Sequence, residues 1–480
     1  MWSGVEQTKL ASACLPLTRE HPGLSGIVPL RVGYDAFAAR VLLAEAAEQT
    51  LDVQYYIWHN DVSGTMLLDA LRRAADRGVR VRLLLDDNNT AGLDEILSAL
   101  DTHRGIEVRL FNPFRHRRAR WLDYLTDFSR LNRRMHNKSF TADNQVTIVG
   151  GRNVGDEYFG AGHDVLFVDL DVLAIGPVAG DVSADFDRYW QAESTCSLSG
   201  VLSLASDTPM TNGTAPAASP RGPDAAAFVD AIERAPFVRD LMERRLAFEW
   251  APTLMLSDDP AKGLGRATDD ALLWSRLKVH MGAPTSELHL VSPYLVPGVA
   301  GSGHFTALAK RGVKVSILTN SLEATDVAAV HAGYAKYRRS MLESGAVLFE
   351  MRAEGPLPPA RRALTGSSGS SRSSLHAKTF AIDRSRIFVG SFNFDPRSAR
   401  LNTELGFLID SPPLARQLAE AFREGVPNRA YSVRLNASSR LEWTESRDGH
   451  QVVYDREPGT RFGLRLAIAA LSVLPIEWLL

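Results

Sequence analysis

The sequence predicts an α/β protein made of two similar domains, each with a mixed, mainly parallel sheet, packed about a pseudo-two-fold axis. The first observation is length: 480 residues exceed the usual size of one domain. The second is that strand, helix and strand follow one another in both halves, which is typical of parallel βαβ units. The third is a His-x-Lys-x4-Asp pattern that begins at His136 and returns 240 residues later at His376.

We expect five parts along the chain: a tail over residues 1–28, a first domain over 29–205, a linker or long loop over 206–223, a second domain over 224–430, and a C-terminal segment over 431–480. The linker is expected from its Ser, Thr, Ala, Pro and Gly content. The composition, 45% hydrophobic and 23% charged, is that of an ordinary globular protein. A net charge of −2 gives no global reason to expect nucleic acid.

The first half begins with an amphipathic helix predicted over residues 34–49, from apolar residues at helical spacing. Aromatic and β-branched residues predict a strand over 51–58. A second helix over 64–77 ends before Gly78 in the C-cap position, and a strand follows over 79–85. This order predicts a right-handed crossover between parallel strands.

The second half repeats this plan. We expect a strand over residues 288–294 and the end of a helix over 305–311. The sequence Arg-Gly-Val that starts at Arg77 returns at Arg311, ahead of another predicted strand. Because Arg-Gly-Val is common in βαβ proteins, this echo only supports the duplication.

The repeated motif carries the groups that a phosphate needs. If the motif lies on a strand, its His and Lys, two residues apart, point to the same face. Each copy also has a downstream Asn, after Gly150-Gly151-Arg152 in one half and Gly390-Ser391-Phe392 in the other. An imidazole, an ammonium and an amide together offer a nucleophile or proton carrier, a fixed cation and a neutral donor. The candidate catalytic residues are therefore His136, Lys138, Asn153, His376, Lys378 and Asn393.

A carboxylate on the other ring nitrogen would fix the tautomer of each histidine. Asp164 and Glu404 both lie 28 residues after the histidine of their own half, and each starts an apolar strand. We include both among the candidate catalytic residues on this equal spacing. The motif acids Asp143 and Asp383 complete that set, although we expect them to close a turn and hold the scaffold.

Residues 115–134 form a basic segment, with seven arginines against two aspartates and with interleaved aromatic and apolar residues. Three interpretations stay open: docking on an anionic membrane, gripping a nucleic-acid backbone, or a solvated helix packed on its own domain. Residues 366–374 predict a Gly/Ser-rich loop before His376. The apolar C-terminal stretch, 464–480, is too short to span a bilayer and predicts an interfacial anchor or a packed terminal helix.

The doubled motif resembles the signature of the phospholipase D superfamily, over roughly residues 33–413. Within that superfamily the chain is most similar to bacterial cardiolipin synthases of the C type. The likeness is carried by the sequences of residues 51–56, 133–138, 150–159, 319–327 and 474–477.

The resemblance implies transfer of a phosphatidyl group from one phospholipid to phosphatidylglycerol, with His136 as nucleophile and His376 as general acid and base. It implies no cofactor and no metal, because two ammonium groups supply the positive charge. The partners would be phosphatidylglycerol, phosphatidylethanolamine as a further donor, and the membrane surface, with no nucleic acid. We place Tyr56, Gly151, Tyr294 and Ser391 among the substrate-binding candidates. The implied location is the bacterial cell membrane, with peripheral or interfacial attachment.

Two other enzymatic functions use the same site. A phospholipase D would pass the phosphatidyl group to water, and a nuclease of the superfamily would act on nucleic-acid phosphodiesters. A membrane-binding scaffold without activity is disfavoured by the two intact motifs. The net charge and the apolar C-terminal stretch favour lipid over nucleic acid.

Overall fold

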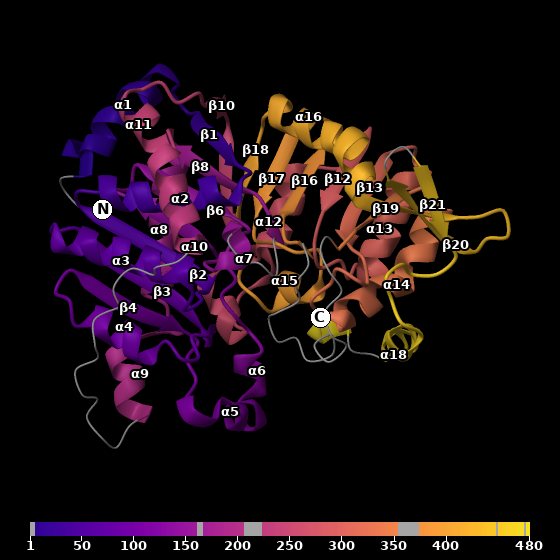
Figure 1. The fold of residues 1–480 in the computed structure, drawn as a ribbon, viewed down its shortest axis with the longest axis horizontal. Coiled ribbons are helices and arrows are strands. Elements are labelled where there is room, and N and C mark those ends of the chain that lie inside the picture. Colours follow the sequence, from indigo (N-terminus) through magenta and orange to yellow (C-terminus); the bar gives the residue numbers. More distant parts are fainter. Residues whose placement is uncertain (1–4, 161–166, 206–222, 354–373, 448–449, 475–476) are drawn as a thin grey trace. The chain divides into compact units, whose positions relative to one another are not determined.

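The computed structural model describes residues 5–160, 167–205, 223–353, 374–447, 450–474 and 477–480. These residues form two compact units (Figure 1). Unit 1 comprises the described residues of 1–162, 170–276 and 401–407, and unit 2 those of 163–169, 277–400 and 408–480. Each unit thus contains a short segment from the other half of the sequence. The expected boundary at residue 224 does not match this division, and the predicted linker falls almost wholly outside the described residues.

Unit 1 is built on a nine-stranded sheet in the order β10-β1-β8-β6-β5-β2-β3-β4-β9. The three strands β2, β3 and β4 run parallel to one another, and their other neighbours pair antiparallel. In sheet order the strands are Glu249–Ala251, Ser25–Leu30, Asp171–Ile175, Val146–Gly150, Ser139–Ala142, Thr50–Ile57, Arg80–Asn89, Ile106–Phe111 and Thr195–Ser197.

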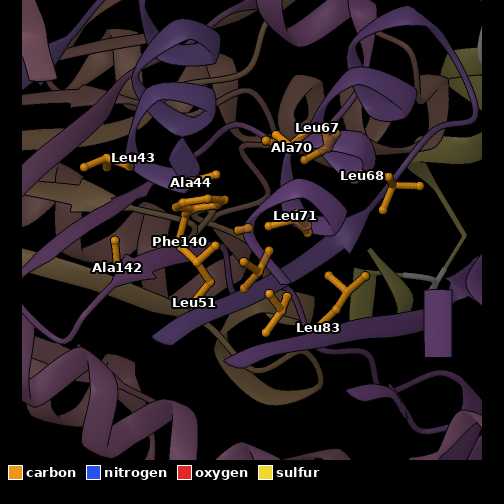
Figure 2. Close-up of a cluster of buried hydrophobic side chains, with 14 of the residues drawn as sticks. Leu43, Ala44, Leu51, Leu67, Leu68, Ala70, Leu71, Leu83, Phe140 and Ala142 are labelled. Carbon is orange, nitrogen blue, oxygen red and sulfur yellow. The ribbon is translucent and has the colours of Figure 1, made fainter. Parts of the chain in front are cut away.

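The core of unit 1 lies where helices α2 and α3 cover the centre of this sheet. Leu43 from α2 and Leu71 from α3 meet Leu51 of β2 and Phe140 of β5 in one buried cluster (Figure 2). Helix α2 was expected from its apolar spacing and α3 from Gly78 in the C-cap position, and Asp61 caps α3 by accepting from the Gly64 N–H at 2.9 Å. The helices of unit 1 are α1 (Lys9–Glu20), α2 (Gly33–Ala46), α3 (Val62–Asp76), α4 (Asp94–Asp101), α5 (Arg120–Thr126), α6 (Phe128–Leu131), α7 (Asp156–Phe159), α8 (Pro177–Trp190), α9 (Leu198–Ala205), α10 (Pro223–Arg234) and α11 (Phe237–Met242).

Unit 2 repeats the central strand order of unit 1, as β18-β17-β16-β12-β13-β14-β19, and extends it with β20 and β21. Strands β12, β13 and β14 are parallel. In sheet order the strands are Leu405–Ile409, Arg386–Gly390, Lys378–Ile382, Glu287–Val291, Lys314–Asn320, Val347–Met351, Ala430–Leu435, Leu441–Arg447 and His450–Tyr454. The chain passes between the units within β18 and within α12 (Leu273–Met281). The helices of unit 2 are α13 (Gly298–Lys310), α14 (Ala328–Glu343), α15 (Pro396–Arg400), α16 (Pro412–Glu420), α17 (Val426–Arg429) and α18 (Phe462–Ser472).

The two-domain α/β expectation is confirmed, but the sheets are not mainly parallel. In each sheet three neighbouring strands run parallel, and the described strands of the motif hairpins pair antiparallel. The reason is that each motif opens a hairpin, β5–β6 or β16–β17, whose strands must run antiparallel. The expected pseudo-two-fold axis stays a prediction.

The expected N-terminal tail is wrong from Lys9 onward. Helix α1 forms there, and its Leu10 and Cys14 side chains are buried in the core of unit 1. β1 then supplies a strand of the sheet. The sequence signal for this helix is weak because Pro16 interrupts it and its mean hydropathy is close to neutral.

Candidate active site

His136 is held in unit 1 by a carboxylate that lies 268 residues away in the sequence. Its Nδ1 lies 2.8 Å from Oε2 of Glu404. The His136 N–H also donates to the Thr403 carbonyl at 2.9 Å, and Met135 forms a parallel bridge with Thr403. An ionised carboxylate only accepts hydrogen bonds, so Nδ1 carries the proton and the lone pair stays on Nε2. Nε2 is therefore the nitrogen that can attack or take up a proton.

A residue of β3, Asp86, holds the two residues that precede His136. Buried Asp86 accepts from the Met135 N–H at 2.7 Å, and Arg134 lies 3.2 Å from the same carboxylate. Burial raises the pKa of Asp86 to about 6, while Arg134 and the Met135 N–H oppose that rise. These contacts restrict the backbone just before the histidine.

Lys138 and Tyr56 lie beside His136. The Lys138 Nζ donates to the His136 carbonyl at 2.5 Å and lies 5.4 Å from the centre of the Tyr56 ring. The Tyr56 ring meets the His136 ring edge-on, with 5.0 Å between centroids. The Tyr56 ring therefore packs against the His136 imidazole, and the buried Lys138 ammonium is bonded to the His136 main chain.

Asn153 is held at the end of β2, against the residue that follows Tyr56. Its Oδ1 accepts from the Ile57 N–H at 3.2 Å, which fixes the amide so that Nδ2 points away. Nδ2 is buried and has no hydrogen-bond partner among the residues that the structure describes. An anionic oxygen would satisfy it. The buried Gly151 differs, because its N–H already donates to the Leu170 carbonyl at 3.2 Å.

The second half-site lies in unit 2 and is built the same way. The His376 Nδ1 lies 2.5 Å from Oδ2 of Asp169, 207 residues earlier. The N–H groups of His376 and Ala377 donate to the Val168 carbonyl, and β15 (Ser374–Leu375) pairs with β7 (Phe167–Val168) in parallel. Lys378 donates to the His376 carbonyl, and its Nζ lies 3.0 Å from the His376 Nδ1. As at His136, a buried carboxylate on Nδ1 favours the Nδ1–H tautomer of the ring.

Tyr294 departs from its counterpart Tyr56. Its hydroxyl donates to Asp326 at 2.7 Å. Next to it, Leu295 forms a parallel bridge with Phe394, immediately after buried Asn393. Ser391, which follows the end of β17 and lies two residues before Asn393, is fully buried. The two half-sites therefore share their His-Lys-Asn set and differ in the tyrosine environment.

The predicted acid partners need correction. Glu404 was matched with His376 by spacing, but it binds His136. Asp164 was matched with His136 and lies outside the described residues, and the acid on His376 is Asp169, which the sequence reasoning missed. The equal spacing misled because the first half has five more residues between its Asn and its acid than the second. A usable signal existed: Val168-Asp169-Leu170 and Thr403-Glu404-Leu405 share a β-branched residue, an acid and a leucine.

Asp143 and Asp383 serve the scaffold. The Asp143 carboxylate accepts from the backbone N–H groups of Glu48, Gln49 and Thr50, just before and at the start of β2. Asp383 accepts in the same way from residues 285–287, just before and at the start of β12. Both sit in hairpin turns with φ of +49°, a conformation that Asp tolerates better than most residues. Neither needs a role in the chemistry.

The motif was expected to lie on a strand, but both histidines precede their strands. β5 begins at Ser139 and β16 at Lys378. Each histidine is held instead by the short parallel pairing with the acid-bearing segment. This arrangement leaves the imidazole at the end of the sheet.

The basic segment directs its described arginines largely inward. Arg117 pairs with buried Asp87 at 2.7 Å and with Asp94, and Arg130 lies 2.6 Å from Asp127. These pairs favour the interpretation of a segment packed on its own domain over one that grips nucleic-acid phosphates. The same segment exposes large apolar side chains, however, and α5 and α6 project from the rest of unit 1 (Figure 1). The exposed fractions are 65% for Trp121, 75% for Leu125 and 43% for Phe128.

At the C-terminus, α18 is both packed and exposed. Ile468 is buried against Leu322 and Ala332, whereas Phe462 and Leu466 are 73% and 60% exposed. Among the described residues no helix has the length and apolar character required to cross a bilayer. The predicted Gly/Ser-rich loop lies outside the described residues except for Ser374.

One group of potential metal ligands occurs among the described residues. Ligand atoms of His59, Asp61 and Glu157 lie within 4.8 Å of one another. His59 is 3.0 Å from Glu157, and Asp61 caps α3. These contacts account for the group without a metal, and we assign none.

Comparisons with known proteins identify the family of this chain. Residues 42–190 and 277–425 both match the family described as "Cardiolipin synthase, PLD-like domain". The chain is 50% identical over 474 residues, 98% of this chain and 100% of the relative, to cardiolipin synthase C of Escherichia coli (strain K12). It is 33% identical to an uncharacterized protein of Helicobacter pylori (strain J99), covering 98% of this chain and 92% of that one. The fold resembles the crystal structure of phosphatidylserine synthase from Haemophilus influenzae Rd KW20, with a TM-score of 0.54, 13% identity, and coverage of 87% of this chain and 91% of that one.

Proposed function

Because this chain belongs to the cardiolipin synthase family of phospholipase D-type phosphatidyltransferases, we propose that it moves a phosphatidyl group from a donor phospholipid to phosphatidylglycerol through His136. The observation that carries the proposal is the pair of histidines, each with Nδ1 on a buried carboxylate. A carboxylate on Nδ1 favours the Nδ1–H tautomer in both rings, and the proposed chemistry uses Nε2.

In the first step, Nε2 of His136 attacks the phosphorus of the donor. An N–P bond forms, and the P–O bond to the headgroup alcohol breaks. His376, as an imidazolium, gives a proton to the departing alkoxide, so the headgroup leaves as a neutral alcohol. Glu404 stabilises the positive charge that builds on the His136 ring.

In the second step, His376 is neutral and takes the proton from a terminal hydroxyl of phosphatidylglycerol. The hydroxyl oxygen attacks the phosphorus, and the N–P bond breaks. Cardiolipin is released, His136 is regenerated and His376 holds the proton again. Donor and acceptor can both be phosphatidylglycerol, and phosphatidylethanolamine is a second candidate donor.

Charge on the non-bridging oxygens is met by the groups beside each histidine. Lys138 and Lys378 supply two ammonium groups, and the free Nδ2 of Asn153 supplies a neutral donor. Donors that are fixed before the reaction stabilise developing charge without reorganising. The lysines hold their positions through the carbonyl of the adjacent histidine.

We also propose that the protein works at the bacterial membrane surface, attached peripherally. Trp121, Leu125 and Phe128 are exposed on the segment that leads into His136, and both acids of that segment are paired. A face with Trp, Leu and Phe and without an unpaired carboxylate suits the bilayer interface. Phe462 and Leu466 of α18 offer a second apolar contact.

The test is a lipid assay with purified protein. Vesicles contain labelled phosphatidylglycerol, alone or with phosphatidylethanolamine, and the lipids are separated after incubation. We expect diphosphatidylglycerol from the unmodified protein and none from His136→Ala or His376→Ala. We expect a chelator to leave the yield unchanged.

Other products would decide against the proposal. Phosphatidic acid alone would show that water is the acceptor, as in a phospholipase D. Cleaved DNA with no lipid product would show a nuclease. Loss of activity in the chelator would contradict a reaction that rests on imidazole and ammonium groups.

A further inference from the structure

A buried ion pair lies directly behind the acid that holds His136. Asp258 follows β11 (Thr253–Ser257), and Lys262 lies in a short 3-10 helix, Pro260–Leu264. The Lys262 Nζ is 2.9 Å from Asp258 Oδ2. The two side chains are 2% and 0% exposed. Burying two charges costs desolvation free energy. The groups that the pair hydrogen-bonds to show which part of the chain it holds in place.

The Asp258 carboxylate accepts two backbone hydrogen bonds. Oδ2 accepts from the Glu404 N–H at 2.9 Å, and Oδ1 accepts from the Leu273 N–H at 2.7 Å. The Asp258 N–H in turn donates to the Glu404 carbonyl at 3.0 Å. Both main-chain polar groups of Glu404 are thus bound to one residue.

The neighbours restrict the remaining freedom of this segment. The Tyr189 hydroxyl donates to the Asp258 carbonyl at 3.0 Å, and the Thr403 hydroxyl donates to Asn137 Oδ1 at 2.8 Å. The backbone at Glu404 therefore cannot move without breaking several buried hydrogen bonds. Burial raises the pKa of Asp258 to about 6, with Lys262 and the Leu273 N–H opposing the rise.

We propose that Asp258, with Lys262 as its counter-charge, is a positioning residue that fixes the Glu404 main chain and so sets the tautomer and orientation of His136. Asp258 acts through two other residues: it binds the Glu404 main chain, and the Glu404 carboxylate binds the His136 Nδ1. The proposed reaction takes place at the other ring nitrogen, Nε2. The inference rests on the proposed role of His136 and goes beyond the His-Lys-Asp motif, because neither residue lies in either copy of it.

The test removes the pair without leaving a buried charge, as Asp258→Ala with Lys262→Met. The matched control is Asp52→Ala with Arg82→Met, which removes another buried ion pair of unit 1. Asp52 lies in β2 and Arg82 in β3, and the Arg82 Nε is 2.7 Å from the Asp52 Oδ1. Two readouts are taken: kcat and KM for cardiolipin formation, and the ¹⁵N chemical shifts of the histidine rings, assigned by comparison with His136→Ala. The ring shifts report which nitrogen carries the proton and need no activity.

We expect the Asp258/Lys262 variant to lose about 10- to 100-fold in kcat with KM changed less than about twofold, as supporting residues of a site commonly do. The His136 ring should change from an Nδ1–H tautomer to a mixture. The Asp52/Arg82 control should keep both kcat and the His136 shifts after correction for the fraction folded. Equal losses in both variants, or an unchanged His136 tautomer, would overturn the proposal.

Asp258→Asn is the second variant if the double change does not fold. Asn keeps the shape and one acceptor oxygen for two backbone donors, so we expect a smaller loss, about three- to tenfold in kcat, with part of the tautomer change. No change in either readout would overturn the proposal. If no variant or parent makes cardiolipin but the tautomer still depends on Asp258, the proposed function fails and the positioning role stands.

Discussion

The Nδ1 of His136 lies 2.8 Å from Oε2 of Glu404, although 268 residues separate them. In the reciprocal pair, the second-half His376 contacts the first-half Asp169, which lies 207 residues earlier in the sequence. Each imidazole is thus oriented by an acid from the other half of the sequence. The duplicated chain makes each half-site from parts of both copies.

This exchange gives the first prediction. Glu404→Gln should lower kcat by about 10²- to 10⁴-fold, because the amide cannot stabilise an imidazolium as a carboxylate does. KM should change little, since Glu404 is buried away from solvent. Steady-state kinetics on mixed vesicles measure this. Glu350→Gln is the control, a buried glutamate bound to Arg338 in unit 2; a similar loss of kcat in both would argue against a specific role for Glu404.

A second prediction separates the observed acid of His376 from the one that spacing suggested. Asp169→Asn should lower kcat by about 10²-fold or more, whereas Asp164→Asn should keep most of the activity. The reason is that both Nδ1 atoms are already bonded, to Glu404 and to Asp169. The pair of variants makes the same chemical change five residues apart. A greater loss of kcat in Asp164→Asn than in Asp169→Asn would support Asp164 as the acid partner, as the spacing suggested.

Much of the fold and half of each site could be predicted from the sequence. The residues His136, Lys138 and Asn153 recur at a fixed offset, local periodicity predicted helix α2, and Gly78 in the C-cap position predicted the end of α3. The acids were paired with the wrong histidines, because the pairing of Thr403 with Met135 is a long-range contact and the tripeptide pattern that the two acid-bearing segments share does not say which histidine each acid contacts. The sequence left three interpretations of residues 115–134 open for a similar reason, since the partners of its arginines, Asp86, Asp87 and Asp94, come from other segments of the chain.

The turn aspartates should affect stability and not chemistry. The backbone N–H groups of residues 285–287 lower the pKa of Asp383 below its ordinary value, against the opposing effect of burial. A depressed pKa means that the carboxylate stabilises the fold above about pH 4 and that this contribution is lost as the pH falls further. Asp383→Ala should cost about 1–2 kcal/mol at pH 7, because it removes these acceptors and places Ala at φ +49°.

Asp383→Asn is the matched variant, since Asn tolerates the same backbone conformation. It should cost less than Ala, and its difference from the parent protein should shrink at pH 3. Denaturant midpoints at pH 7 and pH 3 measure both effects. A fall in kcat for Asp383→Asn that exceeds the loss of folded protein would show a catalytic role after all.

Glu457 provides a pH-dependent test of unit 2. His331 and Arg338 lower its pKa to about 2, against the opposing effect of burial. The charged form therefore stabilises the fold above the unfolded value of about 4.3, and this stability disappears as the pH falls towards 2. Glu457→Gln should lower the stability of unit 2 at pH 7 and match the parent protein near pH 2.

Hydrogen exchange of α14, which carries His331 and Arg338, is the measurement for this prediction. Exchange in α14 should be faster in Glu457→Gln at pH 7, after correction for the intrinsic pH dependence of exchange. Equal protection at pH 7 would show that the pair contributes nothing to the fold.

The membrane proposal predicts that exposed apolar residues of α5 and α6 set the affinity for vesicles. Changing Trp121, Leu125 and Phe128 to Ser should weaken binding to phosphatidylglycerol vesicles by about tenfold or more, because each loses apolar area that would be buried in the bilayer. Turnover of a short-chain, soluble substrate should stay unchanged. Val452→Ser with Val453→Ser is the control, a pair 42% and 49% exposed on β21. Unchanged vesicle binding in the triple variant would place the contact elsewhere.

Whether His136 carries the phosphatidyl group can be measured by trapping the covalent intermediate. The protein is mixed with labelled donor lipid and quenched in alkaline denaturant, in which an N–P bond survives, and the labelled peptide is identified by mass spectrometry. We expect a phosphatidyl adduct on His136 that is absent from His136→Ala. An adduct on His376, or cardiolipin formation with no adduct on any histidine, would contradict it.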